Sequence, residues 1–299
     1  NIEAGTVVRG MPNQGDVASA LIITRGATIY AEGTADNPVI FTAEDDDIND
    51  PGDFTAEDRG EWGGLIILGR ATVARPGGMD NIEGLTVEDR TAFGGGDNPD
   101  DEDNSGVLRY VSIRHGGAAL APGDEINGLT LGGVGSSTEI DYVEVFANFD
   151  DGIEWFGGTV NAKHVVITGA GDDSLDWTDG WQGKLQFAAV RSTVPSSDDP
   201  RGIEADNRDG ENDKTPFSSP SVSNFTLVGT DGNQQGILLR RGTQGNIVNG
   251  IVTGYATGID WHAVCSVEYV TASDYIKRRI SSWIPPCQYP QYADVSGLA

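Results

Sequence analysis

The sequence predicts an all-β solenoid, in which short strands wind into coils that stack on one another. The first observation is a repeat: "DDGIEWFGG" (150–158) is followed by "DDSLDWTDG" (172–180), so Ile153 and Leu175 are 22 residues apart. The second is composition, because 42 of the 299 residues are Gly and helical periodicity of apolar residues is nearly absent.

The repeat extends over most of the chain. Each copy has an apolar-x-apolar strand, a turn containing Gly and a second strand. Near the start, "IEAGTVVRG" and "ITRGATIYAEG" superpose with an offset of 21 residues. Leucine-rich repeats need Leu at fixed offsets, which is not found, so a parallel β-helix with coils about 4.8 Å apart is predicted. The further copies are residues 106–113, 128–145, 152–167, 174–190, 223–229, 236–252 and 257–263.

Three coil segments carry a family resemblance: "IEAGTVVRG" (2–10), "NPVIFTA" (37–43) and "WGGLIILGRATV" (62–73). With them the chain resembles secreted bacterial proteins of the pectate-lyase-like superfamily over about residues 1–262. The resemblance implies a single-stranded right-handed parallel β-helix. It says little about activity, because that superfamily includes lyases, hydrolases, adhesins and proteins without a known role.

Polar, acidic segments interrupt the coils at residues 43–61, 94–106 and 194–216. We expect them to be loop insertions, which a solenoid tolerates because each coil contacts only its neighbours. No linker divides the chain, so the predicted β-helix occupies residues 1–262.

Residues 263–299 form the predicted C-terminal capping segment. Within it, 271–287 has helix-like apolar spacing, with Ser273 as N-cap and Pro285 as stop. An irregular tail is the alternative. Cys265 and Cys287 are expected to form a disulfide, and two free buried thiols are the other interpretation.

The net charge of −27 disfavours nucleic acid and anionic membranes as partners and favours divalent cations or basic partners. No run of 18 apolar residues exists, so no membrane span is expected. Any signal peptide has been removed or omitted, since the chain opens without a basic and apolar leader. A secreted or cell-surface location is expected.

Alternation along the strands predicts an acidic column. Ile153, Trp155, Leu175 and Trp177 should point inward, and the acid between each apolar pair should point outward and be exposed. Stacking then aligns like charges, which is destabilising without a cation or a bound proton. Ile259 and Trp261 extend the inward set, and the outward column consists of Glu154, Asp176, Glu204 and Asp260.

Turn residues add four carboxylates at the same corner of the coils. Dense oxygen ligands suit Ca²⁺ better than zinc. Solvated turn acids are the alternative interpretation. The predicted calcium ligands are Asp150, Asp151, Glu154, Asp172, Asp173 and Asp176, with a weaker site in the loop at Asp206, Asp209 and Asp213.

An enzyme is the competing hypothesis. The motifs "NFDDG" and "GDDSLDW" are similar to those of polygalacturonase-type glycosidases, and this resemblance implies that Asp151, Asp172 and Asp173 are the catalytic carboxylates. The family's Gly-His-Gly and Arg-x-Lys motifs are missing on the following coils. A lyase would need a basic residue beside calcium, and neither Lys184 nor Arg201 lies in such a motif.

The sequence therefore favours a non-catalytic, extracellular structural or adhesive protein that calcium stabilises. The first coil motif begins at residue 2. An uncovered coil can accept another chain. Two interpretations stay open: an upstream segment has been cut away, or the first coil stacks head-to-tail on another copy to form filaments, with cell-surface components as other partners.

Overall fold

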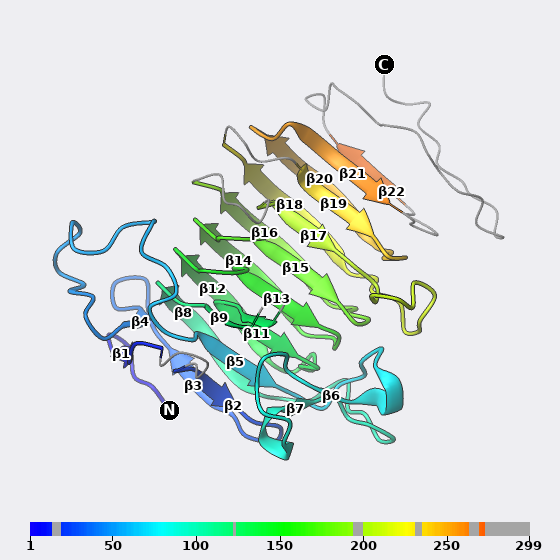
Figure 1. Cartoon of the computed structure of the whole chain (residues 1–299), viewed down its shortest axis with the longest axis horizontal. Coiled ribbons are helices and arrows are strands. Elements are labelled where there is room, and N and C mark those ends of the chain that lie inside the picture. The colour runs from blue at the N-terminus through cyan, green and yellow to red at the C-terminus, as the bar shows by residue number, and fades with distance from the viewer. Residues whose placement is uncertain (14–18, 122–123, 194–199, 231–234, 263–268, 273–299) are drawn as a thin grey trace.

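Two long parallel sheets dominate the computed structural model, which describes residues 1–13, 19–121, 124–193, 200–230, 235–262 and 269–272 (Figure 1). The ten-stranded sheet is, in spatial order, β1 (Val7–Gly10), β4 (Val39–Ala43), β8 (Gly106–Arg114), β12 (Glu139–Phe146), β14 (Asn161–Thr168), β16 (Lys184–Arg191), β18 (Ser221–Val228), β20 (Asn246–Thr253) and β22 (Tyr269–Ala272), with β3 (Ile29–Glu32) beside β8. The eight-stranded sheet is β2 (Leu21–Ile23), β5 (Leu65–Leu68), β11 (Leu129–Gly132), β13 (Ile153–Phe156), β15 (Leu175–Thr178), β17 (Ile203–Ala205), β19 (Gln235–Arg240) and β21 (Thr257–His262).

From β11 onward the chain alternates between the two sheets, and each strand pairs in parallel with the strand one coil away. Ile153 lies opposite Leu175, and Trp155 lies opposite Trp177, so the 22-residue offset is one coil. The predicted parallel β-helix is confirmed.

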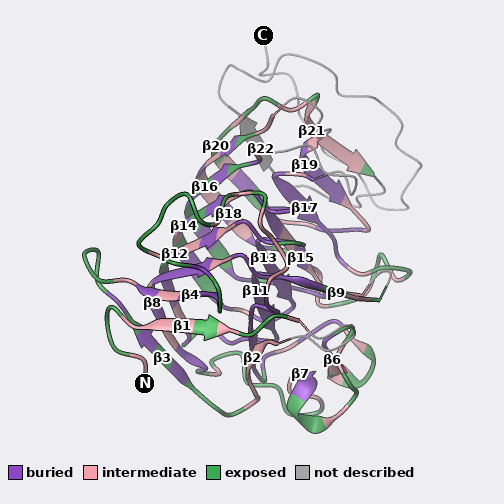
Figure 2. Cartoon of the chain, turned by 60° about the vertical axis from the view of Figure 1, so that its left-hand side comes forward, coloured by how far each residue is buried: buried purple, intermediate pink, exposed green. Residues whose placement is uncertain are grey.

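The inward side chains form a continuous apolar core between the sheets (Figure 2). Ile153, Trp155, Leu175 and Trp177 are completely buried, as predicted. The rings of Trp155 and Trp181 stack with centroids 4.4 Å apart. Farther along, the predicted inward residues Ile259 and Trp261 contact this core but are only partly buried.

The first coils depart from the predicted offset of 21. β1 pairs with β4, and Val7 lies opposite Ile40, which is 33 residues away. A turn between Thr34 and Asn37 separates β3 from β4. The two short strands therefore pair with successive parts of the long strand β8.

Two insertions cover the outer face of the eight-stranded sheet. One contains the 3-10 helices η1 (Pro76–Gly78) and η2 (Asp89–Thr91) and the strands β6 (Asp80–Asn81) and β7 (Ala92–Phe93); the other is the hairpin of β9 (Ala118–Ala121) and β10 (Asp124–Ile126). Their apolar residues, among them Ile82 and Ala118, pack against the outward-pointing Ile66 and Phe156 in a second apolar cluster. That face of the sheet is therefore partly a buried interface.

One residue in the middle of each of six long strands has a positive φ between 49° and 61°. These residues form a column on the ten-stranded sheet, and in the first four coils their rings stack. Tyr142 and Phe187 in this column are 40% and 45% exposed. We call it the stacked-ring column; its members are Tyr110, Tyr142, His164 and Phe187, followed by Asn224 and Asn249.

The predicted insertion 194–216 is shorter than expected, because β17 lies within it. At the C-terminus, β22 falls in the predicted capping segment and adds to the ten-stranded sheet beside β20. The predicted helix from residue 273 onward and the Cys265–Cys287 disulfide lie outside the described residues. No helix in the described part of the chain is long and apolar enough to cross a membrane.

Candidate metal centre

The candidate site lies where the turns before β13 and β15 stack on one another. The Asp151 Oδ1 atom accepts a hydrogen bond from the backbone N–H of Asp173, at 2.9 Å, one coil away. Asn148 fixes the first turn by donating to the Asp151 carbonyl at 2.7 Å. Gly152 makes this close stacking possible, because a Cβ atom there would lie 2.6 Å from the Ser174 carbonyl oxygen.

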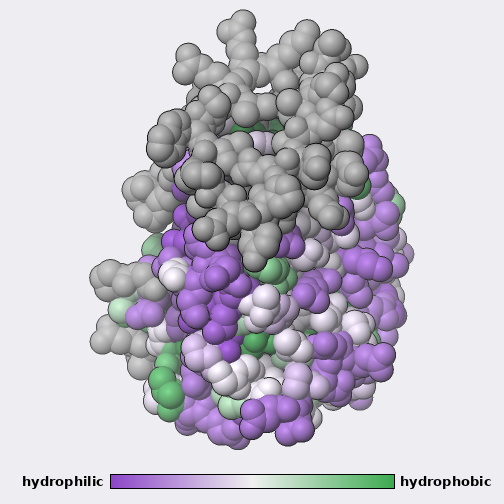
Figure 3. Space-filling view, turned by 90° about the vertical axis from the view of Figure 1, so that its right-hand side faces the viewer, coloured by the Kyte–Doolittle hydropathy of each residue, from purple (hydrophilic) through white to green (hydrophobic). Residues whose placement is uncertain are grey.

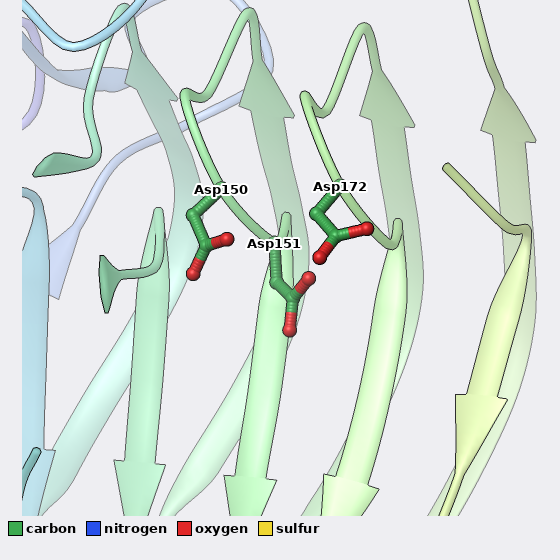
Figure 4. A group of neighbouring side chains, drawn as sticks. All are labelled: Asp150, Asp151 and Asp172. Atoms are coloured by element: carbon green, nitrogen blue, oxygen red, sulfur yellow. The ribbon is translucent and has the colours of Figure 1, made fainter. Parts of the chain in front are cut away.

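Three groups of carboxylates meet at this corner. Within each group, one oxygen from each residue lies within 4.8 Å of the others. Oxygens on opposite sides of a Ca²⁺ ion are about 5 Å apart, so this spacing suits calcium. Figure 4 shows the first group, in which Asp150 and Asp151 on one coil approach Asp172 on the next. The groups are Asp150, Asp151 and Asp172; Asp151, Glu154 and Asp176; and Asp173, Asp176 and Glu204.

The central group is largely enclosed. Asp151 and Glu154 are 6% and 7% exposed. Asn127 donates to Glu154 Oε2 at 2.7 Å, and its own Oδ1 atom is buried without a hydrogen-bond partner among the described residues. Asp176 Oδ1 is also buried without such a partner. Buried polar atoms are rarely left unpaired, so these oxygens are candidate ligands.

The third group differs, because arginines partly neutralise it. Arg201 lies 3.4 Å from both Asp173 and Glu204. Arg240 forms an ion pair with Glu204 as well and contacts Asp206 at 2.8 Å. Positive charge from the chain itself therefore compensates this end of the column.

Burial governs the protonation of the central carboxylates. Burial, followed by repulsion from neighbouring carboxylates, raises the pKa of Asp151, Glu154 and Asp176 well above the usual range. The same causes raise the pKa of Asp150 to about 8. Glu83, on the covering insertion, is exposed as a residue, but neighbouring atoms partly desolvate its carboxyl group and raise its pKa to about 7. Without a cation, these groups favour bound protons at neutral pH.

The structure brings together all six carboxylates that the sequence assigned to the main site. The acidic column keeps its predicted order, with Leu238 between Glu204 and Asp260. The expectation that its acids are exposed is wrong, because the insertions and the arginines bury Glu154 and Glu204.

Sequence reasoning missed Asn127 and Glu83 as parts of the site. Asn127 ends the hairpin insertion, and only its position immediately before β11 hinted that it would stack beside the acidic turns. Glu83 comes from an insertion whose path over the sheet no repeat predicted.

The predicted loop ligands are arranged differently. Arg240 and Arg241 both form ion pairs with Asp206, and Arg241 lies 3.2 Å from the exposed Asp209. Asp213 is exposed. None of these three belongs to a carboxylate group of the kind described above, within the residues that the structure describes.

Two of the three carboxylates of the enzyme hypothesis, Asp151 and Asp173, are buried, and Asp172 is partly exposed. Asp173 is 2% exposed, and its Oδ1 accepts the backbone N–H of Arg201 at 2.7 Å. Asp151 is held by the backbone of Asp173. Both therefore serve the contacts between coils.

Comparison of the chain with curated proteins and with solved structures gave no match. A family model, described as a pectate-lyase-like β-helix domain, matches residues 1–280. That match covers nearly the whole chain and agrees with the stacked parallel coils described above. The chain belongs to the family of pectate-lyase-like β-helix domains.

Proposed function

We propose that this chain is a non-catalytic, extracellular structural or adhesive protein whose β-helix binds Ca²⁺ between adjacent coils. The observation that carries the proposal is the group of Asp151, Glu154 and Asp176, in which three carboxylates lie close together and Asp176 Oδ1 is buried without a hydrogen-bond partner among the described residues. Carboxylate and amide oxygens are the ligands that Ca²⁺ prefers. Asn127 donates a hydrogen bond to Glu154, and its amide oxygen is buried without a hydrogen-bond partner among the described residues.

The energetic argument favours an ion at neutral pH. Several carboxylates buried at coil spacing repel one another, and each loses hydration. Bound protons relieve that cost, but they are lost as the pH rises through the raised pKa values, of which that of Asp150 is about 8. A divalent cation relieves it at every pH at which the carboxylates are ionised, and it also ties one coil to the next.

A structural role is favoured over catalysis because the acids are enclosed. The inward tryptophans of β13 and β15 are buried in the core and do not offer a ring to a sugar. The exposed surface seen in Figure 3 is mostly hydrophilic, in keeping with an acidic protein in contact with solvent. A polysaccharide hydrolase or lyase using Asp151, Asp172 and Asp173 is the second candidate, which the family membership supports.

Assembly with copies of itself is the second part of the proposal. Among the described residues, β1 and β2 are the outermost strands of their sheets and pair on one side only. Strands of another copy, or of a cell-surface partner, would find backbone groups to pair with there. Sedimentation and electron microscopy, with and without calcium, measure whether such assemblies form.

Calcium titration followed by calorimetry tests the central proposal. We expect saturable binding that Asp176→Asn weakens at least tenfold, because it removes a ligand shared by two of the three groups. Asp36→Asn is the matched control, since it makes the same change of charge in an exposed turn outside these groups and should leave the affinity unchanged. Equal losses in both variants would mean that calcium responds to overall charge, and no saturation in the parent protein would reject the site.

A further inference from the structure

A polar pocket beside the first coils gathers positive charge in a chain whose net charge is −27. It has a volume of about 340 Å³ and lies between the turn after β2, the segment after β5, and η2. Its lining includes Thr24, Arg25, Arg70, Asp89, Arg90 and Asn98. Three guanidinium groups and one carboxylate give this lining a charge of +2, opposite to that of the whole chain.

Arg25 is fixed in place by the insertion. Its side chain is 16% exposed and forms an ion pair with Asp89 at 2.7 Å. It also donates to the Gly94 carbonyl at 3.1 Å. Its Nε atom is buried and has no hydrogen-bond partner among the described residues. A buried donor without an acceptor is costly, so Arg25 is held in this position at an energetic cost.

Arg70 supplies a second guanidinium with unused donors. No side chain in the described part of the chain forms a hydrogen bond or ion pair with it, although its charge acts on Asp103 through space. Gly26, at φ +81°, leaves room for it, because a Cβ atom there would lie 3.1 Å from an Arg70 terminal nitrogen. The turn is therefore shaped around a guanidinium that the protein itself does not neutralise.

The composition of the lining defines the ligand. Arginine offers a planar fork of donors that matches the oxygens of carboxylate, phosphate and sulfate groups. No aromatic ring lines the pocket, so nothing there stacks on a flat apolar ligand. Thr24 and Asn98 provide polar groups for hydroxyls. The volume is at the lower end of the range for small-molecule sites, about 300–1,000 Å³.

We propose that this pocket binds the oxyanion group of a small, hydroxylated molecule, with Arg25 and Arg70 as the anchoring residues. The site is separate from the acidic groups between β13 and β17, and its charge has the opposite sign. If the pocket does not bind an anion, the calcium proposal is unaffected, and if calcium does not bind, the proposal for the pocket is unaffected.

Binding is tested by NMR titration of the whole chain with inorganic sulfate, inorganic phosphate, D-glucuronate and D-glucose. We expect at least one of the three anions to saturate and the neutral glucose not to bind. Preference for phosphate or sulfate identifies a tetrahedral oxyanion, and preference for glucuronate identifies a carboxylated sugar. Absence of saturation by every anion, or equal binding of glucose, would overturn the proposal.

Two variants distinguish anion binding in this pocket from a general effect of the protein's net charge. Arg70→Gln should weaken the preferred anion about tenfold, the effect of losing charged hydrogen bonds. Because Arg70 is exposed, the variant should fold normally, which circular dichroism verifies. Arg191→Gln, on the exposed face of β16, removes the same charge and should leave the affinity unchanged. An equal loss in both variants, or no loss in Arg70→Gln, contradicts the assignment.

Discussion

Each of the two sheets of this β-helix carries a column of stacked side chains: aromatic rings on one sheet and carboxylates on the other. On the ten-stranded sheet, the rings of Tyr110, Tyr142 and His164 stack with centroids 4.3–4.4 Å apart, and Phe187 follows at 5.0 Å. On the eight-stranded sheet, Glu154 and Asp176 occupy neighbouring positions of one column.

Each added coil places another side chain of the same kind next to the last one, so the attraction or repulsion between neighbours is repeated along the column. Aromatic rings gain contact with each added coil, so the stacked-ring column stabilises itself. Carboxylates gain repulsion with each added coil, so the acidic column needs arginines, protons or a cation. The structure supplies arginines near Glu204, but the described residues supply no ion pair for Asp151, Glu154 or Asp176. That contrast motivates four predictions.

The largest expected effect is a pH dependence that calcium removes. Because the pKa of Asp150 is raised to about 8 and that of Glu83 to about 7, the folded chain binds more protons than the unfolded chain between about pH 4 and pH 8. The stability of the calcium-free protein is therefore greatest at the acidic end of this range and falls as the pH rises through 7 to 8.

Thermal melts in chelator should show a midpoint that is roughly 5–10 °C lower at pH 8 than at pH 5, for a loss of several kcal/mol. Excess Ca²⁺ should restore most of that difference at pH 8 and have little effect at pH 5, where protons compete for the same oxygens. A melting temperature that rises from pH 5 to pH 8 in chelator would contradict the account of the acidic column.

The stacked-ring column should respond to the shape of its side chains and not to calcium. Tyr142→Asn removes two ring contacts but suits the positive φ, as Asn224 and Asn249 do at equivalent positions. We expect a loss of about 1–2 kcal/mol in the free energy of unfolding. Tyr142→Val should cost about 1 kcal/mol more, because a β-branched residue is strained at that φ. Denaturant melts measure both, and equal losses would argue against backbone strain.

A smaller effect sharpens the contrast, since its sign depends on calcium. In chelator at pH 8, Asp176→Asn should match or exceed the parent in stability by about 1 kcal/mol, because one like charge leaves the buried column. In excess Ca²⁺ the order should reverse. If the variant is less stable in both conditions, Asp176 acts through packing and not through charge.

The smallest expected effect is on glycans. Pectin, polygalacturonate and alginate should be neither hydrolysed nor eliminated, because the carboxylates of the acidic column are enclosed and the net negative charge disfavours acidic polymers. Assays for new reducing ends and for absorbance of an unsaturated product check this. Activity that Asp172→Asn abolishes would establish the enzyme hypothesis in place of the structural one.

The sequence by itself determined the coil, the inward tryptophans and the place where the acids meet. These features depend on the alternation of side chains along a strand and on a repeat of constant length, as between Ile153 and Leu175. Both are local properties that one chain segment displays without knowledge of its neighbours.

Only the tertiary structure decided which columns are covered and which residues join them. The stacked-ring column links residues at offsets of 32, 22 and 23, because turns of unequal length separate them, and so no single period reveals it. Likewise, the sequence does not say where the two insertions lie on the surface. Their position follows from the packing of their apolar residues against Ile66 and Phe156.

The hairpin insertion brings Asn127 onto Glu154, and Arg201 and Arg240 lie against Glu204. Burial is what turns a row of carboxylates into groups with raised pKa values.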